Sequence, residues 1–395
     1  MQRDNFYRDF TPASLFKESG KNLHSEGILT PEDKTDAYNA SCLCNRCGAC
    51  AQNCPSYKAL KAEIFSPRGR NQLVRALFER KLNISADAEA LKRSVSSCIM
   101  CGECSSVCQV NAPTAQLMAE AKYALNCFPG RSFLTSFFAE NYKLYFSLQT
   151  FKYKLQQNIA EAKALYLTSD CGLENAKASL ALINKVYGPC NVMKSGLLLT
   201  RAALTEPYFV FQEILNNIFA EYKNLCADTA LPLVTDNIEE YRLLKQAARL
   251  RGKDFIQPEN IIFITELIKN RIKTCPEEFA GKKILLQNNN IFFDGDDIIA
   301  RTSDIFDCVR NNFLIQLKTK GPNSTGLLSY ATNIRGTEEI KREAAFSVAS
   351  EQPDIFIVFS SADKNFFGEL LKKYYPFTKV MHIALAAGLF YDRQG

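Results

Sequence analysis

Eight cysteines in two copies of one spacing constrain this chain more than any other feature. The copies are Cys44, Cys47, Cys50 and Cys54, followed by Pro55, and then Cys98, Cys101, Cys104 and Cys108. Each cysteine of the second copy lies 54 residues after its counterpart, and Cys42 falls outside the pattern because its counterpart is Ser96. This is the ligand spacing of 4Fe-4S clusters in bacterial ferredoxins.

The fourth cysteine of each copy predicts a crossed ligand scheme, since in two-cluster ferredoxins it binds the other cluster. Cluster 1 is then expected to use Cys44, Cys47, Cys50 and Cys108, and cluster 2 to use Cys98, Cys101, Cys104 and Cys54. Gly48 and Gly102, each directly after a second ligand, are expected to let the backbone approach the inorganic sulfides. Gln109 replaces the expected proline of the second copy, but that proline shapes the chain rather than binding iron.

Zinc and disulfides are weaker interpretations of these cysteines. Structural zinc sites join two ligand pairs across a longer spacer, whereas each copy here places four cysteines within eleven residues. Disulfides between neighbours in one turn would be strained. Fifteen cysteines behind a polar N-terminus, without an apolar export signal, favour thiolate chemistry in a reducing compartment. We therefore expect two 4Fe-4S clusters and a cytoplasmic location.

Composition disfavours several other functions. The formal charge is +6, and two clusters with four thiolates each would reduce it to about +2. The lysines are spread along the chain without a basic run that interleaves with aromatics, so no nucleic-acid partner is expected. Only His24 and His382 are available for a histidine metal site or a catalytic triad. No apolar run approaches the length of a membrane span.

The N-terminal part is expected to be helical around the cysteines, after an extension over residues 1–29. Apolar residues recur at helical spacing in 57–65 and 71–81, and a third helix is expected from Asn111–Thr114 to about residue 126. These elements predict a helical ferredoxin-like domain over residues 30–128. The aromatic-rich segment 129–162 predicts a helical linker, with a contact for a partner subunit or a membrane surface as the alternative.

From residue 163 onward, short apolar strands alternate with helices, as in α/β proteins. Strands are expected at 164–169, 231–235, 283–287 and 355–359, helices at 173–186, 304–318 and 337–350, a loop at 188–190, and closing segments at 262–267 and 380–385. The two halves follow one order at an offset of about 120 residues, which indicates a duplication. The predicted fold class is α+β multi-domain: an all-helical dicluster ferredoxin-like domain followed by duplicated α/β domains at 163–280 and 281–395.

Three segments resemble one family: Cys44–Tyr57, Ser66-Pro67-Arg68-Gly69-Arg70, and Cys98–Cys108. The family is the iron–sulfur subunit of bacterial glycolate oxidase and, more broadly, the D-type subunit of heterodisulfide reductase and the corresponding subunit of anaerobic glycerol-3-phosphate dehydrogenase. Arg68 and Arg70 are expected to place positive charge near the clusters and raise their potential. The alternative interpretation makes them solvated surface arginines.

The resemblance also implies a cysteine-rich signature in each α/β half, and here that signature has decayed. Cys171 and Cys190 remain in the first half; Asp236–Glu239, Thr325–Leu327 and Ser360–Asp363 replace the other elements. Neither half keeps enough thiolates for a cluster. Five cysteines are therefore expected to be ordinary, mostly buried residues: Cys171, Cys190, Cys226, Cys275 and Cys308. His382, in the closing segment, is expected to be structural.

The function implied by the resemblance is that of a non-catalytic electron-transfer subunit. Its expected partner is an FAD-containing dehydrogenase of glycolate or D-lactate, with the flavin on the partner because this chain has no glycine-rich dinucleotide turn. The onward acceptor is a further electron carrier or a membrane quinone system, which would put the chain at the inner membrane. Three alternatives stay open: a heterodisulfide-reductase-like enzyme, a glycerol-3-phosphate-dehydrogenase-like subunit, and an assembly platform.

Overall fold

The computed structural model of the 395-residue chain forms two compact units. Unit 1 comprises Met1–Ser132, Leu204–Tyr208 and Thr325–Glu343, and unit 2 comprises Phe133–Ala203, Phe209–Ser324 and Ala344–Gly395. The structure describes residues 41–79, 81–82, 84–110, 112, 114, 117–118, 121–122, 161–168, 173–193, 199–200, 208–226, 230–251, 255–269, 275–289, 298–313, 316–318 and 337–392. The predicted extension 1–29 and nearly all of the linker 129–162 lie outside these residues.

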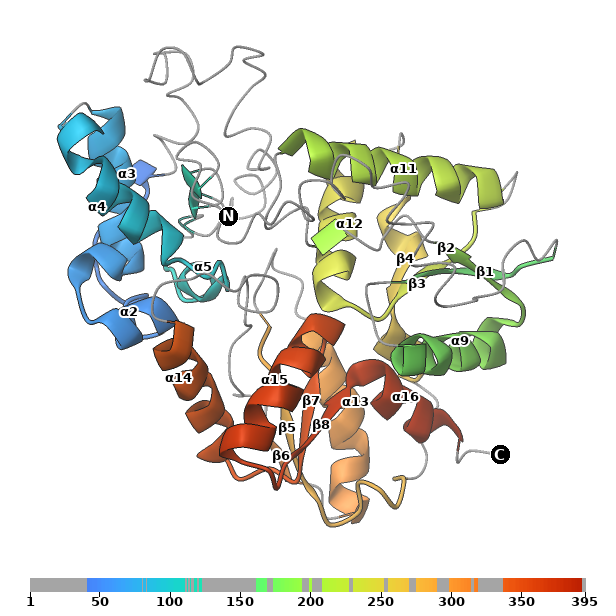
Figure 1. Ribbon diagram of the computed structural model, residues 1–395. Helices are drawn as coiled ribbons and strands as arrows, with labels where there is room; N and C mark the ends of the chain where they lie inside the picture. Colours follow the sequence, from blue (N-terminus) through green and yellow to red (C-terminus); the bar gives the residue numbers. More distant parts are fainter. Residues whose placement is uncertain are drawn as a thin grey trace. The chain divides into compact units, whose positions relative to one another are not determined.

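Short helices surround the cysteine segments of unit 1 (Figure 1). They are α2 (Pro55–Leu60), the 3-10 helix η1 (Glu63–Phe65), α3 (Pro67–Phe78), α4 (Ile84–Ser96) and α5 (Glu103–Ser106). The helix expected over 57–65 is broken because Lys61 adopts a left-handed conformation with φ 50°, which ends α2. The helix expected over 71–81 is α3, whereas α4 was not predicted. Of the third helix, only residues 114, 117–118 and 121–122 are described, and these are helical.

Polar side chains tie the cysteine segments of unit 1 to each other. The Ser56 hydroxyl, fully buried just after the first copy, donates to the Ser97 carbonyl at 2.6 Å, directly before the second copy. Lys122 donates to the Ser96 carbonyl at 3.1 Å. Asn71 on α3 donates through its amide to the Thr114 hydroxyl at 2.8 Å. The bond from Ser56 to Ser97 links the two copies directly, and the other two attach the segment after the second copy to α3 and to the end of α4.

Two parallel sheets of one topology form the core of unit 2. The first contains β1 (Ala164–Leu167), β2 (Cys190–Met193), β3 (Leu233–Thr235) and β4 (Ile261–Phe263) in the order β2-β1-β3-β4. The second contains β5 (Lys283–Leu286), β6 (Gln316–Lys318), β7 (Ile355–Val358) and β8 (Lys379–His382) in the order β6-β5-β7-β8. Leu165 pairs with Leu233 and, equivalently, Ile284 with Ile355. Strands buried on both faces explain the continuous apolar runs.

Helices cover both sheets. In the first half, α9 (Leu173–Tyr187) packs on β1 and β2, α12 (Ile238–Arg251) packs on β3 and β4, and α11 (Tyr208–Cys226) follows β2 in the chain. In the second half, α13 (Ile298–Phe313) contacts β6, and α15 (Ser361–Tyr374) packs on β7 and β8. The last helix, α16 (Ile383–Asp392), packs against α9 and joins the halves, while the boundary between the units falls inside α14 (Thr337–Ala349).

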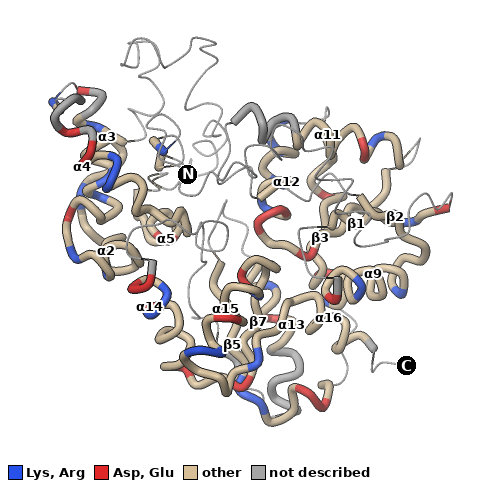
Figure 2. Tube along the Cα trace, in the orientation of Figure 1, with Lys and Arg blue, Asp and Glu red and all other residues tan. Residues whose placement is uncertain are grey.

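The surface charge and the length of the helices bear on binding partners. Lys and Arg are interspersed with Asp and Glu along the described elements of both units (Figure 2). None of the described helices is long and apolar enough to cross a membrane.

For two elements of the α/β part, the predicted end was wrong. The loop expected at 188–190 already contains the first residue of β2, and the helix expected over 304–318 ends at Phe313 and is followed by β6. Both strands lie at a sheet edge, where Ala164 pairs with Cys190 and Lys283 with Gln316. Pairing with a distant strand determined their conformation, which a local pattern does not reveal. The domain boundaries at 163–280 and 281–395 stay predictions.

The carboxyl ends of strands from both sheets meet in unit 2. The Ile238 amide, at the start of α12, donates to the Phe359 carbonyl, directly after β7, at 3.1 Å. The Asn289 side-chain amide donates to the carboxylates of Glu239 at 3.0 Å and Asp363 at 3.3 Å. All three of these polar side chains are buried. The segments that replace the cysteine signature, 236–239 and 360–363, thus contribute to one polar network.

His382 gives unit 2 a pH dependence that can be measured. Its imidazole is fully buried, its Nδ1 accepts the Ala384 amide at 3.2 Å, and burial together with the nearby Lys364 lowers its pKa to about 3. In the unfolded chain the imidazole has its ordinary pKa of 6.5 and takes up a proton below that pH, whereas in the folded chain it stays neutral down to about pH 3. The free energy of unfolding therefore decreases as the pH falls from 6.5 towards 3. The loss is about 3 kcal/mol at pH 4.

The expected result is that His382→Asn removes this part of the acid sensitivity. Urea unfolding of unit 2 at pH 7 and pH 4 measures it: the free-energy gap between wild type and the variant should shrink or reverse at pH 4. An equal gap at both pH values would contradict a neutral buried imidazole.

Candidate metal centre

The two cysteine copies fold into turns of the same backbone conformation. Positive φ values occur at equivalent positions: Arg46 61°, Gly48 83°, Met100 57° and Gly102 80°. In each copy the glycine carbonyl accepts a backbone hydrogen bond, from Ala51 at 3.0 Å and from Ser105 at 2.9 Å. The glycines expected at close approaches therefore adopt the left-handed conformation that favours glycine. Arg46 and Met100, which have side chains, adopt it too, and neither was predicted from the sequence.

Two cysteines, Cys44 and Cys108, lie beside Cys50. The pKa of the Cys50 thiol is raised to about 11, first by burial and then by the neighbouring Cys44 and Cys108, because thiolates repel each other. Cys47 lies between Cys44 and Cys50 in the same turn and is exposed. We call Cys44, Cys47, Cys50 and Cys108 group 1. The structure thus brings the last cysteine of the second copy to the first copy.

The other four cysteines form a second, more deeply buried group. Burial raises the pKa of Cys104 well above its ordinary value, and Cys98, Cys54 and, more weakly, Cys50 raise it further. Burial also raises the pKa of Cys101, followed by the charges of Glu103, Cys54 and Cys104. We call Cys54, Cys98, Cys101 and Cys104 group 2. Cys54 from the first copy therefore lies with the second copy, and Cys50 and Cys104 are where the groups approach each other.

The chemistry of these donors fits iron–sulfur clusters. All eight cysteines are free thiols, and Cys54, Cys98 and Cys101 are buried. Among the described residues, no three His, Cys, Asp or Glu side chains converge as the ligands of one metal ion would. A cubane does not require such convergence, since each thiolate binds a different iron atom. The desolvated, mutually repelling thiolates need a cationic iron core to stabilise their charge.

Hydrogen-bond donors point at the sulfurs of both groups. The Ala112 amide donates to Cys108 Sγ at 3.3 Å, and the Arg68 backbone amide lowers the pKa of Cys50 by a hydrogen bond. The Arg70 guanidinium donates from Nη1 to Cys54 Sγ at 3.6 Å. Such bonds favour the thiolate over the thiol and are a main means by which proteins adjust clusters.

Arg70 is buried among the cysteine segments, contrary to the surface alternative. Only 1% of the residue is exposed. Its Nε donates to the Ser94 carbonyl at 3.0 Å and its Nη2 to the Ser97 hydroxyl at 2.7 Å, while Nη1 faces Cys54. Ser97 in turn donates to the Ser94 carbonyl at 2.7 Å. The guanidinium is therefore fixed at the sulfur of a group 2 cysteine by the end of α4.

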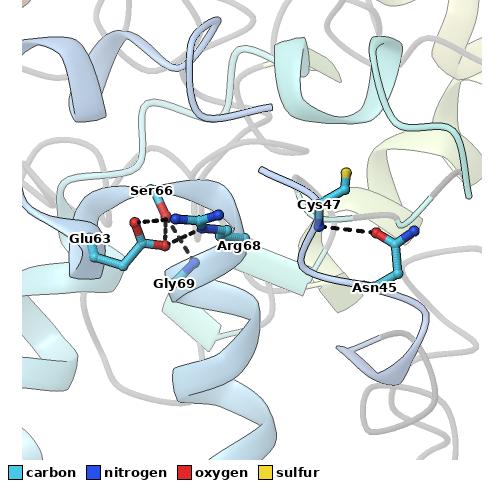
Figure 3. Close-up of polar contacts among 6 residues, drawn as sticks. All are labelled: Asn45, Cys47, Glu63, Ser66, Arg68 and Gly69. Carbon is cyan, nitrogen blue, oxygen red and sulfur yellow. Dashed lines mark hydrogen bonds and ion pairs between the residues drawn. The ribbon is translucent and has the colours of Figure 1, made fainter. Parts of the chain in front are cut away.

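Arg68 lies at the turn of the first cysteine copy. Unlike Arg70, it is paired with a carboxylate, that of Glu63 (Figure 3). Its Nε and Nη2 donate to the two carboxylate oxygens of Glu63 at 2.6 and 3.1 Å, and its side chain is 37% exposed. A Cβ on Gly48 would lie 2.7 Å from Arg68 Nη1, so the guanidinium packs against the turn of group 1. Ser66 donates to the same carboxylate at 2.8 Å and accepts the Gly69 amide at 3.0 Å.

Several polar residues of this site were not predicted from the sequence. Glu63 neutralises Arg68, while Ser94 and Ser97 anchor Arg70. The run Ser94-Val-Ser-Ser97 directly before Cys98 was the one signal for them, because a serine hydroxyl buried beside a metal ligand needs a hydrogen-bond partner. That partner, 24 to 27 residues earlier, could not be inferred from a single sequence.

The structure describes the side chains of four of the seven remaining cysteines, and all four are free thiols. Cys190 and Cys226 are buried, with 4% and 7% exposure, and burial raises the pKa of Cys190 to about 12. Cys42 and Cys275 are half-buried free thiols. Cys171 lies outside the described residues, and the Cys308 side chain is not described.

Comparison with known proteins identifies the cysteine region. Residues 41–112 match the family of 4Fe-4S dicluster domains. A probable glycolate oxidase iron-sulfur subunit from Bacillus subtilis (strain 168) is 38% identical over 80 residues, which are 20% of this chain and only 17% of the relative. The crystal structure of a hypothetical protein from Helicobacter pylori has a TM-score of 0.54 at 9% identity and covers 83% of this chain and 68% of that one. That likeness shows the fold alone.

The matched segment contains all eight cysteines of groups 1 and 2, the turns that carry them, and Arg68 and Arg70. Residues 41–112 of this chain therefore match a 4Fe-4S dicluster domain in both sequence and cysteine arrangement, which supports an iron–sulfur binding region in this part of the chain.

Proposed function

We propose that the chain binds two 4Fe-4S clusters, cluster 1 through group 1 and cluster 2 through group 2, and relays electrons from a flavoprotein partner. The observation that carries the proposal is the proximity of Cys108 to the first cysteine copy and of Cys54 to the second. Cys108 raises the pKa of Cys50, and Cys54 raises that of Cys101 and Cys104, which is the proximity that crossed ligation requires. The bound clusters supply one-electron transfer.

The partner is proposed to be an FAD-containing dehydrogenase of a small 2-hydroxy acid such as glycolate or D-lactate. Oxidation of the hydroxy acid to the 2-oxo acid gives two electrons and two protons to the flavin, which then releases the electrons singly. The printed name of the Bacillus subtilis relative, a probable glycolate oxidase iron-sulfur subunit, supports this choice. A quinone or another electron carrier is the proposed acceptor.

The α/β halves favour a relay over a heterodisulfide-reductase-like enzyme. Catalytic cleavage of a disulfide in such relatives requires cysteine-rich centres. In this chain, Glu239 and Asp363 lie in the segments that replace them, and both carboxylates accept hydrogen bonds from Asn289. Such a network joins the two halves of unit 2 and offers no thiolate ligands at those positions.

Anaerobic reconstitution of the full-length chain tests the cluster part of the proposal. The expected content is about eight irons and eight sulfides per chain, with a 4Fe-4S signal in electron paramagnetic resonance after dithionite reduction. A content of about four irons at saturation would contradict two clusters.

Affinity-tagged chain, purified with its partner, tests the electron donor. The complex is expected to contain flavin, and glycolate or D-lactate should bleach the visible absorbance of the clusters without added dithionite. Glycerol 3-phosphate serves as the comparison substrate. If it bleaches the clusters and both hydroxy acids do not, the partner assignment is wrong while the cluster assignment stands.

A further inference from the structure

Two arginines of one short segment, Ser66–Arg70, lie at different cysteine groups. Arg68 packs against the Gly48 turn of group 1, and Arg70 donates to Cys54 of group 2. They are two residues apart on α3 and so face different directions on the helix. Their surroundings differ in one respect that matters for a redox centre: only one of the two guanidinium charges is neutralised.

The Arg70 charge has no counterion within the described part of the chain. Its partners are the Ser94 carbonyl, the Ser97 hydroxyl and Cys54 Sγ, none of which is a carboxylate. The residue is 1% exposed, so solvent does not screen it. Arg70 also acts on Cys104, whose pKa it lowers against the larger effects of burial and three neighbouring cysteines. The positive charge is therefore directed at group 2.

The Arg68 charge is compensated. Glu63 accepts two hydrogen bonds from it in a fork-to-carboxylate geometry, and both side chains are partly exposed, at 37% and 50%. Such a pair is nearly neutral when viewed from the Gly48 turn, and solvent screens what remains of its field.

Two features of group 2 lower the reduction potential of its cluster and so oppose the effect of the Arg70 charge. Reduction adds a negative charge, which a buried site tolerates poorly, and three of the four group 2 cysteines are buried. Glu103, 4% exposed, adds negative charge beside Cys101. Both features act to lower the reduction potential of a cluster held by group 2. Among the described residues, the buried Arg70 guanidinium donates to a group 2 sulfur, that of Cys54. Its positive charge offsets the effects of burial and of Glu103.

We propose that Arg70 selectively raises the reduction potential of cluster 2, while the pairing of Arg68 with Glu63 keeps Arg68 from doing the same at cluster 1. The segment Ser66–Arg70 then sets the potential difference between the clusters. This inference rests on the ligand sets of the proposed function. It assigns unequal roles to two arginines that the sequence alone treats alike.

Potentiometric titration of the fully loaded, full-length protein tests the inference, with Arg70→Gln, Arg68→Gln and Glu63→Gln compared. Arg70→Gln is expected to lower one of the two reduction steps by at least a tenfold change in its equilibrium, about 59 mV for one electron. Arg68→Gln should move neither step by that much. Glu63→Gln, which frees the Arg68 charge, should raise the step that Arg70→Gln leaves unchanged.

Three outcomes would overturn the inference: unchanged potentials in Arg70→Gln, a larger shift in Arg68→Gln, or movement of the same step by Arg70→Gln and Glu63→Gln. Because iron content is measured on every sample, such a result in loaded protein leaves the proposed function intact. Failure of the wild-type chain to bind eight irons would instead contradict the proposed function itself.

Arg70→Lys and Ser97→Ala keep the inference testable if Arg70→Gln does not bind its clusters. Arg70→Lys retains the charge, so both potentials should stay close to those of the wild type. Ser97→Ala removes one anchor of the guanidinium and should lower the same step by a smaller amount. If loaded Arg70→Lys shows the full loss expected of Arg70→Gln, packing rather than charge sets the potential, and the inference is wrong.

Discussion

Replacing Cys54 and Cys98 together by serine is expected to remove one cluster, whereas replacing Cys54 and Cys44 together removes both. In the crossed scheme Cys54 and Cys98 both belong to group 2, so once one of them is replaced, replacing the other removes little further iron. The other pair takes one ligand from each group. Iron analysis should give about four irons per chain for Cys54→Ser/Cys98→Ser and nearly none for Cys54→Ser/Cys44→Ser. The effects of substitutions within one group are therefore strongly non-additive.

The uncrossed scheme predicts the opposite pattern, so the two double variants decide between the schemes. If Cys54→Ser/Cys44→Ser keeps about four irons and Cys54→Ser/Cys98→Ser keeps none, ligands are not exchanged between the copies. Cys42→Ser is a matched control, since Cys42 is a half-buried free thiol two residues before the first ligand. It should retain the full iron content.

Gly69→Ala is expected to destabilise the Ser66–Arg70 segment severely. A Cβ at this position would overlap the backbone carbonyl of Glu63 and lie 3.1 Å from the Ser66 hydroxyl. Backbone cannot move aside as a flexible side chain can, so the turn that orients Arg68 and Arg70 must shift. Overpacking of this kind costs about 1–3 kcal/mol, and cluster retention should fall with it. Loss of visible absorbance during urea unfolding under anaerobic conditions measures the effect.

Gly368→Ala is the matched control for this substitution. Gly368 lies within α15 and does not have a positive φ. A Cβ added at this position would meet no heavy atom within 4 Å. The added methyl group should leave unit 1 unchanged and stabilise α15 by about 0.5–1 kcal/mol. Equal cluster loss in the two alanine variants would show that the close approach at Gly69 does not matter.

The sequence predicted the parts of this molecule that depend on local spacing. The cysteine positions follow from the dimensions of a turn, and α9, α14 and β7 follow from apolar periodicity within their own residues. The repeat of about 120 residues agrees with two sheets of the same strand order. In each of these cases the determining information lies in neighbouring residues or in a repeat along the chain.

The parts that depend on distant partners were not predictable. β6 has one strongly apolar residue, Leu317, and becomes a strand because it pairs with β5. The difference between Arg68 and Arg70 is invisible in the sequence because it depends on Glu63 in one case and on Ser94 and Ser97 in the other. Which charge is neutralised is decided by tertiary structure.

The hydrogen bond from the Ile238 amide to the Phe359 carbonyl has a consequence for how unit 2 comes apart. It joins the start of α12 in the first half to the end of β7 in the second, next to the buried side chains of Glu239, Asn289 and Asp363. Opening one half alone would break this bond and the hydrogen bond from Asn289 to Glu239, at a cost of about 1–3 kcal/mol for each buried group left unsatisfied. The two sheets therefore unfold together, and a destabilising substitution in one half weakens both.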